Sequence, residues 1–138
     1  MLPRVIVLLC MILALSYGQE IPQELDAKIS KFYEQVKNGE IKTALEDITQ
    51  DGSLYSKIFG DEVTTKNFVN QIANLEQFYG KLYQHELVKE QSLGRMYKLT
   101  YFFYYEKHVG RFVFTYYDAQ NEWKLVNFVF DDSVLEEF

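Results

Sequence analysis

The chain has little cysteine, little proline and a deficit of positive charge. Its 138 residues include one cysteine and two prolines, while 48% are hydrophobic and 17% aromatic. This composition excludes a disordered, a collagenous and a disulfide-stapled protein. Lysine and arginine number 14 against 20 aspartate and glutamate, for a net charge of −6 at pH 7. Because nucleic-acid binding needs clustered cations to neutralise phosphates, we expect no nucleic-acid partner.

The first eighteen residues have the pattern of a secretory signal peptide. Arg4 supplies positive charge, residues 5–15 form an unbroken run of eleven apolar residues, and Ser16 and Gly18 are small residues that precede a cleavage site. A membrane span needs about 20 apolar residues, so we expect residues 1–18 to be removed and no span in the mature chain. Residues 19–138 then form a single exported domain, periplasmic or extracellular, without Cys10 and therefore without a thiol.

Helical periodicity dominates the first half of this domain. After Pro22, apolar residues recur at spacings of four, three and four, which places them on one face of a helix that ends at Asn38-Gly39: Leu25, Ile29, Phe32 and Val36. Similar patterns predict helices over residues 41–48 and 54–59. A further helix is predicted to end at Tyr79, with Thr64 or Thr65 as its N-cap.

After Gly80 the sequence becomes rich in tyrosine, phenylalanine, valine and threonine, which favour strands. Three turn-like segments divide it, predicting strands over residues 81–91, 95–106, 111–117 and 122–131. Connections this short make neighbouring strands antiparallel. The sequence therefore predicts an α+β fold in which N-terminal helices pack on a curved, cone-like four-stranded antiparallel sheet.

The alternation of side chains predicts one aromatic face on this sheet. If Glu106 pairs with Arg111, as opposite charges favour, three aromatic pairs lie on the same face: Tyr105 with Phe112, Phe103 with Phe114, and Tyr101 with Tyr116. The same parity adds four residues of the last strand to that face: Trp123, Leu125, Asn127 and Val129. We expect the helices to cover this inner face and the opposite, outer face to be wetter.

The last strand, residues 123–132 with the sequence WKLVNFVFDD, follows a sheet that starts at Tyr79-Gly80. This layout resembles the nuclear transport factor 2-like, or cystatin-like cone, superfamily and is similar to exported bacterial proteins of uncharacterised function. The resemblance covers most of residues 22–132 and implies a cone with an apolar pocket between helices and sheet. It implies no particular activity, because this fold hosts both enzymes and binding modules.

No complete catalytic or metal-binding motif is present. The segment from His85 to Lys89 has lysine where the zinc-protease helix motif needs its second histidine, and it is predicted to be a strand. We therefore expect neither a metal nor a cofactor.

The remaining candidates for chemistry are two neighbouring residues in the first strand, Glu86 and His85. A direct turn before Arg95 places Glu86 opposite Tyr101 on the inner face, whereas a one-residue bulge places His85 there instead. Burial would shift the pKa of either group. The expected ligand pocket is formed by residues facing the helices: Tyr101, Tyr116 and Asn127.

Two functions follow from these features. The favoured one is an exported, non-catalytic module that binds a small apolar ligand or a protein partner, with a homodimer through the sheet as a further option. The alternative is a small isomerase- or lyase-like enzyme. Glu86 or His85 would then act as the base, and Tyr101 or Tyr116 would donate a hydrogen bond to developing negative charge.

Overall fold

Helices precede a sheet along the part of the chain that the computed structural model describes, residues 22–50 and 52–138. The predicted signal peptide lies outside these residues. The helices are α2 (Gln23–Lys37), α3 (Ile41–Thr49), α4 (Leu54–Phe59) and α5 (Glu62–Tyr79). The strands are β1 (Leu82–Leu93), β2 (Met96–Tyr105), β3 (Val109–Ala119) and β4 (Glu122–Asp131), and a short 3₁₀ helix, η1 (Val134–Glu137), follows them.

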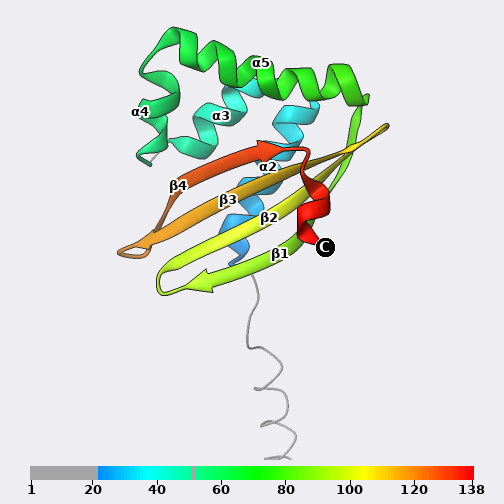
Figure 1. Ribbon diagram of the computed structural model, residues 1–138. Coiled ribbons are helices and arrows are strands. Elements are labelled where there is room, and N and C mark those ends of the chain that lie inside the picture. The colour runs from blue at the N-terminus through cyan, green and yellow to red at the C-terminus, as the bar shows by residue number, and fades with distance from the viewer. Residues whose placement is uncertain (1–21, 51) are drawn as a thin grey trace, which may run out of the picture.

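The four strands form one antiparallel sheet in the order β1-β2-β3-β4. Figure 1 shows α2 behind the sheet and η1 in front of it, so the two lie on opposite faces. The predicted α+β fold, with helices N-terminal to an antiparallel sheet, is confirmed.

Helix α5 begins earlier than predicted. Its N-cap is Asp61, whose carboxylate accepts hydrogen bonds from the backbone N–H of Thr64 at 3.4 Å and from its hydroxyl at 2.9 Å. The expectation that Thr64 or Thr65 caps this helix is therefore wrong. Aspartate satisfies the free N–H groups of a first turn as well as threonine does, and its charge also complements the helix dipole.

The pairing of β2 with β3 is offset by four residues from the predicted register. Tyr101, and not Tyr105, lies opposite Phe112. The predicted pairing of Glu106 with Arg111 fails because Arg111 bonds to Asp131 on β4, while Glu106 accepts the backbone N–H of Lys81. Because the offset is an even number of residues, the side chains of β2 and β3 remain on their predicted faces. The predicted aromatic inner face of these strands is therefore present.

Bulges in both edge strands reverse the alternation of side chains. In β1, Leu87 pairs with Tyr101 and Lys89 with Thr100, which makes Val88 the extra residue. The bulge alternative is therefore the correct one, and His85 lies on the inner face.

The bulge in β4 corrects another expectation. Tyr116 pairs with Leu125 and Thr115 with Asn127, which makes Val126 the extra residue. Residues after Val126 change sides, so Asn127 and Val129 lie on the outer face, and their predicted inner position is wrong. The bulge brings Phe128 inward in their place, where it is buried. Burial of that ring explains why the strand departs from strict alternation.

The core lies between α2, α3 and the inner face of the sheet. Phe32 of α2 packs its ring against four phenylalanine rings at centroid distances of 5.6 to 6.2 Å: Phe103, Phe112, Phe114 and Phe128. These rings come from β2, β3 and β4, so one helix residue holds three strands at a fixed distance. Three of the four contacts of the Phe32 ring are edge-to-face, as the charge distribution of aromatic rings favours.

Two adjacent substitutions in β3 test these face assignments. Phe114→Ala removes a fully buried ring and should lower the free energy of unfolding by about 3 to 5 kcal/mol through lost burial and the cavity that remains. Thr115→Ala, on the outer face, should lower it by less than about 1 kcal/mol. Urea denaturation measures both values, and losses of similar size would contradict the assignment of faces.

Candidate functional site

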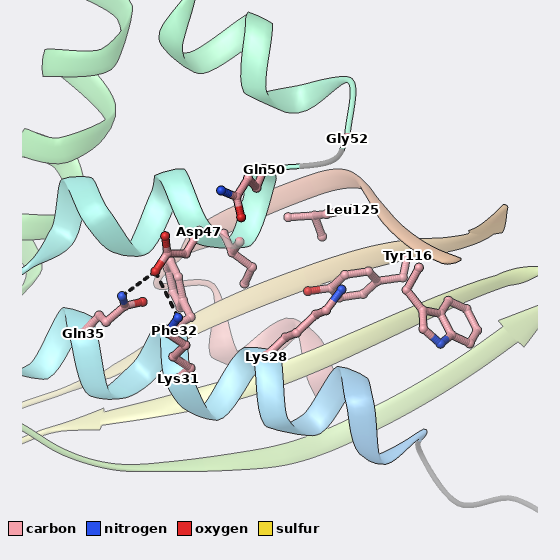
Figure 2. Close-up of a pocket in the computed structure, with 11 residues that line it drawn as sticks. Lys28, Lys31, Phe32, Gln35, Asp47, Gln50, Gly52, Tyr116 and Leu125 are labelled. Atoms are coloured by element: carbon pink, nitrogen blue, oxygen red, sulfur yellow. Dashed lines mark hydrogen bonds and ion pairs between the residues drawn. The ribbon is translucent and has the colours of Figure 1, made fainter. Parts of the chain in front are cut away.

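A cavity of about 240 Å³ lies between α2, α3 and the β3–β4 hairpin (Figure 2). One part of its lining is apolar and comes from the core: Phe32, Ile48, Trp123 and Leu125. The other part is polar and comes largely from the helices: Lys28, Lys31, Gln35, Asp47 and Gln50. Tyr116 and Gly52 complete the lining. A cavity with an apolar body and a few polar groups is typical of small-molecule sites.

Gly52 brings the segment between α3 and α4 close to the sheet. A Cβ atom at this position would lie 2.5 Å from the carbonyl oxygen of Leu125, closer than such atoms can approach. Only glycine therefore allows this segment to lie directly against β4. Gly52 is thereby placed in the lining of the cavity.

The charged groups of the cavity compensate one another. Asp47 accepts a hydrogen bond from Gln35 Nε2 at 2.8 Å, and Lys31 Nζ lies 3.2 Å from the same carboxylate oxygen. The hydrogen bond from Gln35 is the main reason why the pKa of the Asp47 carboxyl lies below its usual value, and Lys31 adds to the effect. Lys28 Nζ lies 3.6 Å from Oε1 of Glu24, which is one helical turn earlier in α2. Each of the two lysines in the lining is therefore paired with a carboxylate.

Two buried polar atoms at the cavity lack a hydrogen-bond partner among the described residues: the Tyr116 hydroxyl and Gln35 Oε1. Tyr116 is 1% exposed, and burial raises the pKa of its hydroxyl, which keeps it protonated. In Figure 2 this hydroxyl points from β3 into the cavity toward α2. Because Gln35 uses its amide N–H on Asp47, its carbonyl oxygen remains free to accept. An unsatisfied buried group of this kind costs about 1 to 3 kcal/mol.

His85 forms a second cluster, between α2 and the inner face of β1. Its ring stacks on Tyr33 with centroids 4.2 Å apart and faces Tyr101 at 6.0 Å. Its Nε2 atom lies 3.4 Å from the hydroxyl of Ser30, and the Tyr101 hydroxyl donates to Asp26 at 3.1 Å. Burial lowers the pKa of His85, and the nearby carboxylate of Asp26 opposes this shift in part. Neither His85 nor Tyr101 lines the cavity.

Glu86 does not lie on the inner face. It pairs with Phe102, and its exposed side chain accepts a hydrogen bond from the Tyr104 hydroxyl at 2.6 Å. This bond is the main reason why the pKa of Tyr104 rises to about 12. The expectation that places Glu86 opposite Tyr101 is wrong, because the bulge at Val88 turns Glu86 outward.

The three expected pocket residues are therefore in three different places. Tyr116 lines the cavity, Tyr101 lies on the inner face next to His85, and Asn127 lies on the outer face, where it lines a different hollow. The helix residues of the cavity were not among the expected pocket residues. A signal for them exists, since four cavity residues of α2 have the spacing of one helix face: Lys28, Lys31, Phe32 and Gln35.

Within residues 22–50 and 52–138, no three histidine, cysteine, aspartate or glutamate side chains are grouped as metal ligands. Over the same part of the chain, every helix is too short or too polar to cross a membrane. Comparison of the chain with protein-family models, curated proteins and solved structures gave no match.

The lowered pKa of His85 makes the stability of the fold depend on pH, in a direction that can be stated. Because half-burial lowers the pKa of His85, histidine in the unfolded chain, with its ordinary pKa of about 6.5, takes up a proton more readily than the folded residue does. Stability should therefore fall as the pH decreases from about 7.5 to about 5.5. His85→Gln should make this decrease smaller, as measured by urea midpoints across that range. Equal slopes for the wild type and the variant would contradict the placement of His85.

Proposed function

We propose that this protein is an exported, non-catalytic domain that binds a small ligand in the cavity between α2, α3 and the β3–β4 hairpin. The observation that carries this proposal is the Tyr116 hydroxyl, buried, protonated and without a partner at the cavity wall. A native structure rarely leaves such a group unsatisfied unless water or a ligand pairs with it. The apolar run of residues 5–15 supports export.

The cavity limits the chemistry of the ligand. At about 240 Å³ it is smaller than the roughly 300 Å³ at which sites for drug-sized molecules begin. Its rings and aliphatic side chains suit an apolar body. A ligand that accepts a hydrogen bond from Tyr116 and donates one to Gln35 Oε1 would satisfy both free atoms. The resemblance to the nuclear transport factor 2-like superfamily, which implies a pocket between helices and sheet, agrees with this proposal.

The enzyme alternative receives less support. It needs a base within about 3 Å of a tyrosine hydroxyl on the inner face. His85 is on that face, but it lies outside the cavity, and its ring nitrogen approaches Ser30. The hydroxyl of Tyr101 donates to Asp26, whose exposed carboxylate belongs to α2. Glu86 lies on the outer face.

Two tyrosine-to-phenylalanine substitutions separate binding from stability. The Tyr105 hydroxyl is also buried and unpartnered, but Tyr105 does not line the cavity, which makes it a matched control. Both Tyr116→Phe and Tyr105→Phe should leave the free energy of unfolding unchanged or raise it by about 1 kcal/mol, since each removes an unsatisfied group. Only Tyr116→Phe should weaken ligand binding.

Binding is measured by ligand-observed NMR with a library of small hydrogen-bond-accepting fragments. We expect fragments that bind the wild type and Tyr105→Phe equally and Tyr116→Phe at least about tenfold more weakly, the loss of one hydrogen bond. Failure of every fragment to bind the wild type would mean that water fills the cavity, and the proposal would be abandoned. Equal binding to all three proteins would place the site elsewhere.

A further inference from the structure

A second hollow adjoins the proposed ligand cavity near the N-terminal end of α2. It has a volume of about 250 Å³ and is lined by residues of the first two turns of α2 and by residues 121–124, where β4 begins. Lys28 and Trp123 line both the cavity and this polar hollow, so the two spaces meet at these side chains. In Figure 2 the side chain of Lys28 reaches from α2 toward Tyr116. A ligand in the cavity that extends past Trp123 would therefore enter the polar hollow.

The linings of the two spaces differ in polarity. The body of the cavity is apolar and formed by core residues such as Phe32, Ile48 and Leu125. Apart from Trp123, every residue that lines the polar hollow is charged or carries an amide: Glu24, Lys28, Asn121, Glu122 and Lys124. The two spaces together therefore match a molecule that has an apolar body at one end and a polar head group at the other.

The charged side chains around the two spaces are paired one to one. Each lysine lies close to one carboxylate: Lys28 3.6 Å from Glu24, Lys31 3.2 Å from Asp47, and Lys124 3.1 Å from Glu122. These six are all the charged residues of both linings, which therefore carry no net charge in a chain whose net charge is −6. A charged head group would have to displace one member of a pair, whereas a hydroxyl or an amide can hydrogen-bond to both members. The pairing thus favours an uncharged ligand.

We propose that the ligand of the cavity is an uncharged amphipathic molecule whose hydroxyl- or amide-bearing head group occupies the polar hollow. This inference rests on the proposed function, since it requires that the apolar body of the ligand fills the cavity beside Tyr116. The head group would hydrogen-bond to Glu122, Lys124 and the side-chain amide of Asn121, all of which line the polar hollow. Glycosides of small apolar alcohols or phenols belong to this chemical class.

Four probes that share a 4-hydroxyphenoxy body test the head group. 4-Methoxyphenol has no head group, 4-hydroxyphenyl β-D-glucoside has an uncharged one, 4-hydroxyphenoxyacetate an anionic one and 4-(2-aminoethoxy)phenol a cationic one. In each probe the ether oxygen can accept from Tyr116 and the phenol can donate to Gln35 Oε1. Trp123 is the only tryptophan of the chain, so its indole N–H signal reports binding in NMR titrations at low salt. We expect the glucoside to bind at least about fivefold more tightly than each of the other three probes.

One charge substitution in the polar hollow has a matched control. Glu122→Gln leaves Lys124 without its partner and should raise the affinity for 4-hydroxyphenoxyacetate at least about threefold. The Glu122 side chain is 73% exposed, so this variant should fold normally. Glu90→Gln makes the same change of charge at an exposed position on β1 that lines neither space. It should alter that affinity by less than about twofold.

The outcomes separate this inference from the proposed function. Equal affinity for all four probes, or tighter binding of a charged probe than of the glucoside, would overturn the inference. If Tyr116→Phe still weakens binding in that case, the proposed function stands. An equal response of 4-hydroxyphenoxyacetate to Glu122→Gln and Glu90→Gln would also overturn the inference, because the head group would then lie outside the polar hollow. If no probe shifts the indole signal, the inference is wrong, and the fragment screen decides the proposed function separately.

Discussion

The packing of Phe32 on the sheet is the constraint on which the rest of this structure depends. Its ring touches phenylalanines from β2, β3 and β4, so α2 can take only one position and spacing relative to those strands. The cavity is a consequence of that position. Lys28, Lys31 and Gln35 lie on the side of α2 that Phe32 places next to α3 and the β3–β4 hairpin. Moving the helix outward would expose the rings to water, and the hydrophobic effect strongly disfavours this exposure.

The bulges at Val88 and Val126 adapt the edge strands to this core. Without the extra residue Val126, strict alternation would bury Asn127 and expose Phe128, and the amide would have to find partners among aromatic rings. With it, Phe128 packs on Phe32, and Asn127 lies on the outer face of the sheet. Val88 has the matching effect in β1, where it brings His85 against Tyr33 and leaves Lys89 free to reach Glu137. The positions of His85 and Phe128 on the inner face therefore depend on the single-residue bulges at Val88 and Val126.

The periodicity of the sequence was sufficient to predict the helices and strands and the face on which most of their side chains lie. The spacing of Leu25, Ile29, Phe32 and Val36 fixes the buried side of α2, and each of the four is buried. Alternation placed Tyr101, Phe112, Phe114 and Tyr116 inside even though the register was off by four residues, because parity depends only on whether an offset is even. The charge argument predicted the wrong register for β2 and β3. Arg111 had two possible acidic partners, Glu106 and Asp131, and only the folded structure decides between them. The bulge at Val126 depends on contacts between distant segments, which local patterns do not encode.

The central claim is that these bulges decide which side chains face the helices, and thiol accessibility tests it most directly. In a background that carries Cys10→Ser, a cysteine introduced as Asn127→Cys or as Val129→Cys would be the only thiol. Both positions are exposed on the outer face. The account predicts that each thiol in the folded protein reacts with a water-soluble disulfide reagent within about tenfold of its rate in the urea-unfolded chain. Protection of both thiols by several orders of magnitude would place Asn127 and Val129 inside the core and contradict the account.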